Sequence, residues 1–99
     1  MKNKSLFLFA TISPKDEYFV KAKEALLNMI EDTRKEEGCK KFDLHDDGKQ
    51  LYLYEEWLDE LSLHQHHEKE YTKEVFEKYK TWLKKPTEIV KMFKSFNDK

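Results

Sequence analysis

The sequence predicts an α+β domain built on one antiparallel sheet, and three observations support this fold class. Four short segments, at residues 5–12, 40–45, 50–57 and 88–96, show the two-residue alternation of strands and are rich in apolar and aromatic side chains. Two longer segments between them space their apolar residues as helices do. The length of 99 residues allows one domain, residues 1–99.

The first strand, residues 5–12, is expected to present apolar side chains on both faces. One face takes Leu6, Leu8, Ala10 and Ile12, and the other takes Phe7, Phe9 and Thr11. Ser13 and Pro14 follow as the expected cap and first residue of a helix, and Gly38 is the expected left-handed residue at its end. The inward stripe of this helix is predicted to include Phe19, Ala22, Leu26, Ile30 and Thr33, and it is widened by Val20, Leu27 and Met29.

The second and third strands, 40–45 and 50–57, are expected to form a hairpin. Asp47 and Gly48 between them match a two-residue turn in which both residues take a positive φ. The third strand again has two large faces. Leu51, Leu53, Glu55 and Trp57 share one of them, and Tyr52, Tyr54 and Glu56 share the other.

A second helical region is expected from its cap, Asp59, to about Lys84. Its middle, residues 64–70, is polar, which predicts a bend or two successive helices. Pro86 prevents its continuation, and the last strand, about 88–96, is expected to place Val90, Met92 and Phe96 on one face. The resulting order, β-α-β-β-α-β, is the ferredoxin-like arrangement.

The two-faced sheet predicts a homodimer. Two helical regions can cover only one face of a four-stranded sheet. The other face would expose an apolar patch larger than soluble monomers usually show. The same face of a second subunit is a self-complementary cover for it.

The charge pattern argues against nucleic-acid and membrane partners. The chain has 19 basic and 20 acidic residues, which are interleaved and give a net charge of -1. Its longest apolar run, residues 6–12, is far shorter than the roughly 20 residues that span a bilayer. The single Cys39 allows no internal disulfide, so we expect a cytoplasmic location.

His66 is the candidate base, because histidine titrates near neutrality and His66 follows Leu63 on the inward side of the predicted helix. His64, His67 and Glu68 share a neighbouring face. A metal-binding trio is one interpretation of these three residues and a solvated polar patch is the favoured one, so no metal is expected.

Glu55 and Trp57 lie on the same predicted strand face. An acid on an apolar face must be paired, hydrogen-bonded or directed into a wet cavity. The pair therefore belongs either to a site or to the core with a local hydrogen bond. Cys39 adjoins Lys40 and Lys41, which favour a thiolate, but with no base identified beside it an inert thiol is the preferred interpretation.

Three short motifs resemble the antibiotic biosynthesis monooxygenase family in their order and spacing. They are Glu37-Gly38-Cys39-x-x-Phe42-x-Leu44, Tyr54-Glu55-x-Trp57 and Leu63-x-x-His66, and the resemblance covers roughly residues 5 to 95. It implies a ferredoxin-like subunit that dimerises face to face into a dimeric α/β barrel. It also implies one of several activities. Members include cofactor-independent quinol and anthrone monooxygenases, haem-degrading enzymes and an isomerase of a signalling-molecule phosphate.

The haem-degrading members resemble this chain at Trp57 and at His66, which is the position of their haem ligand. They also use an asparagine in the first strand, and this chain has no asparagine between Leu6 and Ile12. The family also often has a second histidine near position 71, where this chain has Tyr71.

From the resemblance we expect a monooxygenase that needs no cofactor and uses O2 to oxidise a quinol-like or other electron-rich aromatic molecule. A pocket between the sheet and the helices is expected to be lined by Phe7 or Phe9, Trp57, His66 and Tyr71, with His66 as base and Glu55 orienting or pairing. The alternatives are a non-catalytic or stress-related small-molecule binder of the same fold and, after it, a haem-binding or haem-degrading protein.

Overall fold

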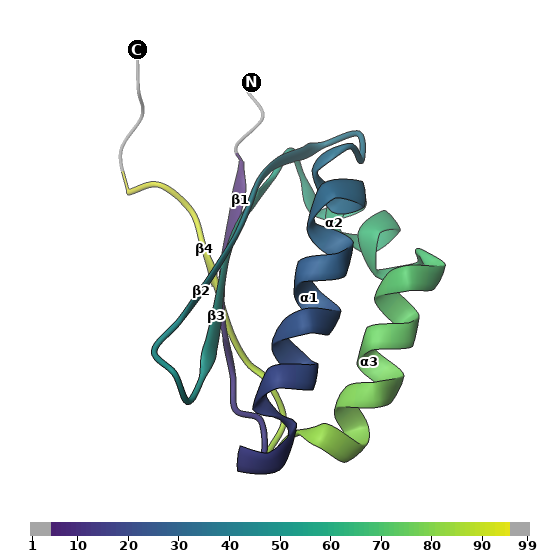
Figure 1. Ribbon diagram of the computed structural model, residues 1–99. Helices are drawn as coiled ribbons and strands as arrows, with labels where there is room; N and C mark the ends of the chain where they lie inside the picture. The colour runs from purple at the N-terminus through teal and green to yellow at the C-terminus, as the bar shows by residue number, and fades with distance from the viewer. Residues whose placement is uncertain (1–4, 96–99) are drawn as a thin grey trace.

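A computed structural model describes residues 5–95 and confirms the α+β fold with an antiparallel sheet. The elements follow one another as β1 (Leu6–Ile12), the short 3-10 helix η1 (Asp16–Tyr18), α1 (Phe19–Arg34), β2 (Cys39–Asp46), β3 (Leu51–Trp57), α2 (Glu60–His67), α3 (Glu70–Trp82) and β4 (Glu88–Met92). All helices cover the same face of the sheet, so the described part of the chain has two layers (Figure 1).

The strand order in the sheet is β2-β3-β1-β4, and each neighbouring pair is antiparallel. β1 and β3 are therefore the central strands, in a register that pairs Leu6 with Trp57 and Leu8 with Glu55. β4 is an edge strand beside β1. This order is that of the ferredoxin-like arrangement predicted from the sequence.

The alternation of β1 and β3 places their inner side chains in the core, as expected. Leu6, Leu8, Ala10 and Ile12 of β1 are buried with Leu51, Leu53, Glu55 and Trp57 of β3. α1 lies on this face through the buried residues Ala22, Leu26, Met29 and Thr33, which repeat at helical spacing. Phe19 and Ile30 of the predicted stripe are only partly buried and pack against the edge of this core, whereas Met29 is buried.

The outer face of the sheet is aromatic. Phe7 stacks on Tyr54 and Phe9 stacks on Tyr52, with ring centroids 6.3 and 5.9 Å apart. Val90 continues this face on β4, because it pairs with Phe9 in the register. The helices of the described residues 5–95 lie on the other face (Figure 1), and here Phe9 and Val90 are exposed while Phe7 is buried.

The first helix begins later than the sequence suggested. Ser13 and Pro14 are not its cap, since α1 starts at Phe19 after η1. Pro14 instead forms an isolated β-bridge with Leu83, and the carbonyl of Ser13 accepts the backbone N–H of Lys84 at 2.8 Å. This tertiary pairing with the chain after α3 keeps residues 13–15 extended, which local capping signals could not reveal.

The hairpin between β2 and β3 is confirmed, but its turn differs from the predicted one. Gly48 has a φ of 87°, whereas Asp47 does not take a positive φ. The Asp47 carboxylate accepts the backbone N–H groups of Lys49 and Gln50 instead, at 2.9 and 2.7 Å. The loop is thus longer and is held by a side chain, as Asx turns are.

The second helical region is two helices, one of the two arrangements that the polar segment 64–70 allowed. Asp59 caps α2 by accepting the backbone N–H of Ser62 at 2.8 Å. β4 ends at Met92, short of the predicted 88–96, and Phe96 lies outside the described residues.

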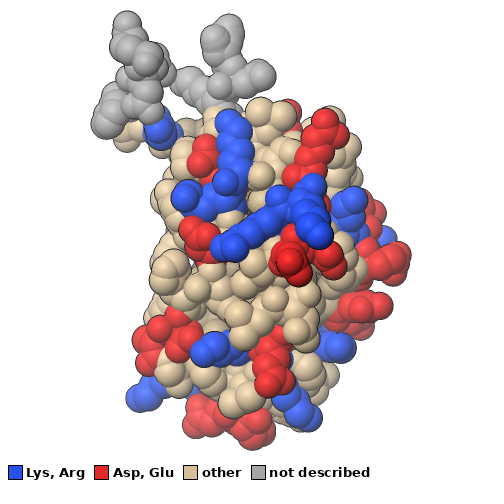
Figure 2. All heavy atoms as spheres, turned by 45° about the horizontal axis from the view of Figure 1, so that its top comes forward, with Lys and Arg blue, Asp and Glu red and all other residues tan. Residues whose placement is uncertain are grey.

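Charged side chains of both signs are interspersed over the face shown in Figure 2. In the described part of the chain, no helix is long and apolar enough to cross a membrane.

Candidate functional site

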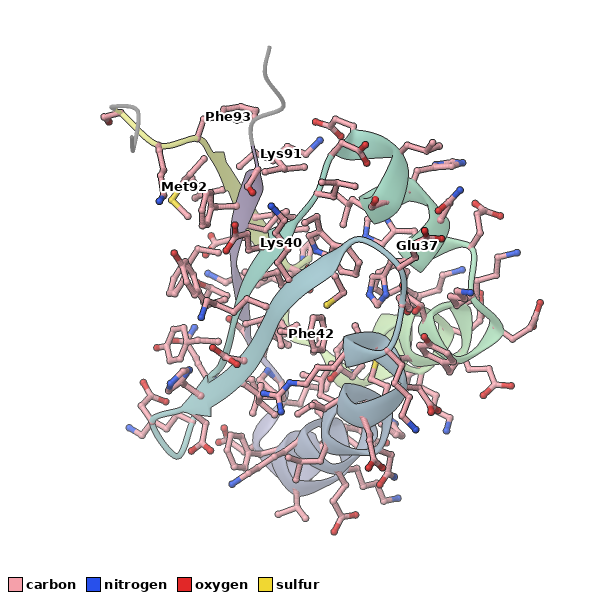
Figure 3. The ribbon with its side chains drawn as sticks, turned by 90° about the horizontal axis from the view of Figure 1, so that it is seen from above. Glu37, Lys40, Phe42, Lys91, Met92 and Phe93 are labelled. Carbon is pink, nitrogen blue, oxygen red and sulfur yellow. The ribbon has the colours of Figure 1, made fainter. Side chains whose placement is uncertain are left out.

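A cavity of about 600 Å³ lies between the inner face of the sheet and the helices. Its walls are mostly apolar: Leu8, Ala10, Ile12, Leu26, Met29, Phe42, Leu53, Val75, Phe76, Tyr79, Leu83, Pro86 and Ile89. Its polar lining residues are Glu55, His66, His67, Thr72 and Thr87, together with the lysines 80, 84 and 85. Figure 3 shows Phe42 of β2 on the helix side of its strand.

The cavity opens between α3 and β4. Its exposed lining residues are Phe76 and Lys80 of α3, Lys84, Lys85 and Pro86 of the following loop, and Ile89 of β4. The lining residues that come from β1, β2 and β3 are all buried. The cavity is therefore open to solvent between α3 and the edge strand β4.

The closed end of the cavity contains a buried histidine–carboxylate pair. His66 Nδ1 lies 2.9 Å from Glu36 Oε2, and their side chains are only 5% and 6% exposed. The imidazole also packs against Trp57, with ring centroids 4.8 Å apart, and against the edge of Phe42 at 5.6 Å. These contacts hold the ring in one position.

Glu36 reaches His66 because of the turn after α1. Gly38 in this turn has a φ of 92°, and a Cβ at this position would collide with Ser62 of α2. Glycine thus lets the start of α2 approach the end of α1 closely. Glu36 and His66, thirty residues apart in sequence, come into contact as a result.

Tyr71, on the first turn of α3, donates its hydroxyl to the same oxygen of Glu36 that His66 contacts. Burial of the Tyr71 phenol and this hydrogen bond raise its pKa above the ordinary value. The phenol therefore stays protonated and remains a donor. It fixes the carboxylate of Glu36 in the orientation that the imidazole requires.

This arrangement determines which imidazole nitrogen is free. A carboxylate at Nδ1 stabilises the tautomer with the proton on Nδ1, which leaves Nε2 with a lone pair. Burial lowers the pKa of His66, and the hydrogen bond and negative charge of Glu36 oppose this shift. The ring is thus neutral near pH 7 and can accept a proton from a ligand in the cavity.

Glu55 is the second acid–base group of the cavity. Its Oε1 accepts the indole N–H of Trp57 at 2.8 Å. Burial raises the pKa of the carboxyl to about 7, against the lowering effect of that hydrogen bond, and the nearby charge of Glu36 raises it further. Both protonation states of Glu55 are therefore populated near neutral pH.

The structure brings together four of the six residues proposed for the site. Glu55 and His66 line the cavity, while Trp57 and Tyr71 lie behind them as hydrogen-bonding and packing partners. Phe7 and Phe9 do not join them. They project from the outer face of the sheet, because strand side chains alternate and the inner positions of β1 have even numbers.

Glu36 and His67 were missed in the sequence. Glu36 lies in the turn after α1, which ends at Arg34, so the helical spacing of α1 does not indicate that its side chain points inward. His67 was assigned to a more exposed face. It lines the cavity, with its ring 5.6 Å from those of His66 and Phe76.

Neither of the other candidate groups forms a site. Among residues 5–95, no three His, Cys, Asp or Glu side chains are placed to hold a metal ion. Burial, with the charges of Glu36 and Glu55, raises the pKa of Cys39 to about 11. The thiol is therefore protonated despite Lys40 and Lys41.

An apolar cavity with a few convergent acid–base groups, here within a ferredoxin-like subunit, is the usual form of a small-molecule site. The sequence profile of the antibiotic biosynthesis monooxygenase family matches residues 5–78. The chain belongs to this family. A comparison with curated proteins finds no match.

Solved structures show the same fold over nearly the whole chain. A conserved protein from Methanosarcina mazei is 32% identical, with a TM-score of 0.83 over 90% of this chain and 91% of that one. Rv0793 from Mycobacterium tuberculosis is 21% identical, with a TM-score of 0.87 over 95% and 97% of the two chains. A protein described as an antibiotic biosynthesis monooxygenase is 23% identical, with a TM-score of 0.82 over 88% and 95%.

Proposed function

We propose that the protein is a monooxygenase that acts without a cofactor on a quinol-like or other electron-rich aromatic molecule. Membership of the antibiotic biosynthesis monooxygenase family supports the reaction type. The observation that carries the proposal is the Glu36–His66 pair, which provides a fixed, neutral base at the closed end of an apolar cavity.

The substrate supplies the electrons in this reaction. His66 Nε2 removes a hydroxyl proton, and the resulting anion transfers electrons to O2 more readily than the neutral phenol does. For a simple hydroquinone, one oxygen atom enters the ring and the other leaves as water, so that hydroquinone and O2 become a hydroxyquinone and water. Glu55 can return a proton to the departing oxygen, since its carboxyl is partly protonated near pH 7.

Oxygen uptake with a panel of hydroquinones tests this proposal. We expect His66→Ala to reduce kcat by about 100-fold or more, the usual contribution of a positioned base. His64→Ala is the matched control, because His64 is on the same helix, is exposed and does not line the cavity. Unchanged turnover in His66→Ala would refute the assignment of the base. Tight ligand binding without oxygen uptake would instead support the non-catalytic binder.

The haem alternative has a separate readout. Adding hemin while recording the Soret band distinguishes a haem protein from the proposed enzyme. We expect no shifted band, since the strand that would supply the asparagine of the haem degraders has none.

The active form proposed here is a homodimer joined through the outer sheet face. Phe9 and Val90 are exposed on this face and Tyr52 and Tyr54 are half-buried, beside the buried Phe7, and these side chains supply the apolar area for the interface. Light scattering at micromolar concentration should give about twice the chain mass of 12.1 kDa. A single species at the chain mass would contradict the dimer. A cytoplasmic location is proposed with it, on the basis of the single cysteine.

A further inference from the structure

The geometry points to an elongated substrate with an anionic group at one end and a hydroxyl at the other. The hydroxyl lies against His66 and Glu55 at the closed end of the cavity, and the anion lies among Lys80, Lys84 and Lys85 at the open end. This inference rests on the proposed function, since it concerns the same cavity, and it narrows the substrate class to hydroxylated aromatic acids longer than one ring.

The sheet wall sets the length of the cavity. Its lining residues on β1 run from Leu8, which pairs with Glu55, to Ile12. These positions are four residues apart, which corresponds to about 13 Å along a strand. Beyond Ile12 the chain reaches Pro14, which bridges to Leu83 at the end where the lysines lie.

The helix wall has the same length. Thr72, Val75, Phe76, Tyr79 and Lys80 line the cavity at the spacing of one helix face of α3. From Thr72 to Lys80 the helix rises by about 12 Å. Thr72 is next to Tyr71, which binds Glu36, so the N-terminal end of this face adjoins the Glu36–His66 pair.

The two ends differ in charge. The closed end holds a carboxyl group and an imidazole base, both of which favour a hydrogen-bond donor. The open end is lined by three lysines, and none of the lining residues found there among residues 5–95 is acidic. Between the ends the lining is apolar, with Met29, Leu53 and Val75 on the inside. A molecule that is complementary to this pattern donates at one end and is anionic at the other.

The lysines have acidic neighbours, but these contacts are weak. Lys84 lies 3.6 Å from Asp16, whose side chain is 96% exposed, and Lys85 lies 3.5 Å from Glu88. Lys80 pairs with Glu77 within α3, and both side chains are over 70% exposed. Such exposed pairs contribute little, so the lysines can turn to a ligand anion at small cost.

Two matched ligands and two matched variants test the inference. The probes are 6-hydroxy-2-naphthoic acid, which is rigid and carries its carboxylate opposite its hydroxyl, and its neutral methyl ester. Binding is measured by naphthol fluorescence under argon, so that no turnover occurs. The variant K80Q/K84Q/K85Q removes the open-end charges. The control K49Q/K73Q/K78Q changes the net charge equally at exposed lysines that do not line the cavity.

We expect the acid to bind the full-length protein about tenfold more tightly than the ester, the effect of two or three partly exposed ion pairs. K80Q/K84Q/K85Q should remove this preference and leave the affinity for the ester unchanged. Added salt should lower the affinity for the acid and leave the affinity for the ester unchanged. The control variant should retain the preference.

Equal binding of acid and ester, an equal loss in both variants, or no binding of either probe would overturn the inference. Oxygen uptake is then measured separately. Uptake with neutral hydroquinones alone leaves the proposed function intact and removes the anionic substrate class. If the protein binds the acid in a charge-dependent way but consumes no oxygen with any hydroxylated acid or hydroquinone, these acids are its ligands and the proposed monooxygenase activity is refuted.

Discussion

The two faces of the sheet are made from alternate residues of the same strands, but they differ in chemistry. Glu55 and Glu56 are neighbours on β3. Glu55 points inward, is 7% exposed, binds Trp57 and has its pKa raised to about 7. Glu56 points outward, beside the aromatic pairs, and is half-exposed. Burial under the helices is therefore what raises the pKa of the Glu55 carboxyl toward neutrality.

The outer face differs in a second respect. Its stacked aromatic pairs, Phe7–Tyr54 and Phe9–Tyr52, need only shape and apolar area, which suits an interface. The inner face combines packing with three ionisable groups, Glu36, Glu55 and His66, held in fixed orientations. Substitutions at equivalent positions on the two faces should therefore have different consequences.

The largest difference is expected at the aromatic residues. Trp57 is fully buried, and Trp57→Ala should lower the free energy of unfolding by about 3–5 kcal/mol, because it leaves a cavity and removes the donor to Glu55. Tyr52→Ala on the outer face should lower the free energy of unfolding by about 1 kcal/mol. Urea unfolding of both variants at one low protein concentration measures this. Equal losses would show that the two faces do not differ in packing.

The second difference concerns pH. The pKa of Glu55 is higher in the folded chain, about 7 against 4.5, so the folded state binds more protons between these values. Stability contributed by Glu55 is complete below pH 4.5 and is lost as pH rises to 7, by about 3 kcal/mol in total.

The free energy of unfolding of Glu55→Gln, relative to that of the wild type, should therefore be higher at pH 7.5 than at pH 5. The lowered pKa of His66 acts in the opposite direction, with stability lost as pH falls below 6.5, and it cancels in this difference. Glu56→Gln is the control, because it makes the same change at the neighbouring position on the outer face. Parallel pH profiles for wild type and Glu55→Gln would exclude a raised pKa at Glu55.

The smallest difference is expected at two threonines. Thr72 is 1% exposed, and its hydroxyl has no hydrogen-bond partner among residues 5–95. Thr72→Val keeps the shape and removes the unpaired hydroxyl, so it should raise the unfolding free energy by about 1 kcal/mol. Thr11→Val on the half-exposed outer face should change it by less than about 0.5 kcal/mol. A destabilising Thr72→Val would mean that the hydroxyl has a partner, such as a bound water.

Much of the fold was predictable from local patterns. Alternation in residues 5–12 and 50–57 assigned the inner and outer residues correctly, and the Asp59 cap was confirmed. The start of α1 was not predictable, because Pro14 pairs with Leu83 and overrides the local helix signal. The site was predicted in part. Glu55, Trp57, His66 and Tyr71 come together, whereas Phe7 and Phe9 lie on the other face.

The sequence by itself determined which side of the sheet Glu55 and Trp57 share, since alternation depends only on backbone geometry. It also determined that both faces of the sheet are apolar. Only the tertiary structure decided that His66 has a carboxylate partner. Glu36 meets it because Gly38 allows α1 and α2 to approach, and a contact across thirty residues leaves no periodic signal in the chain.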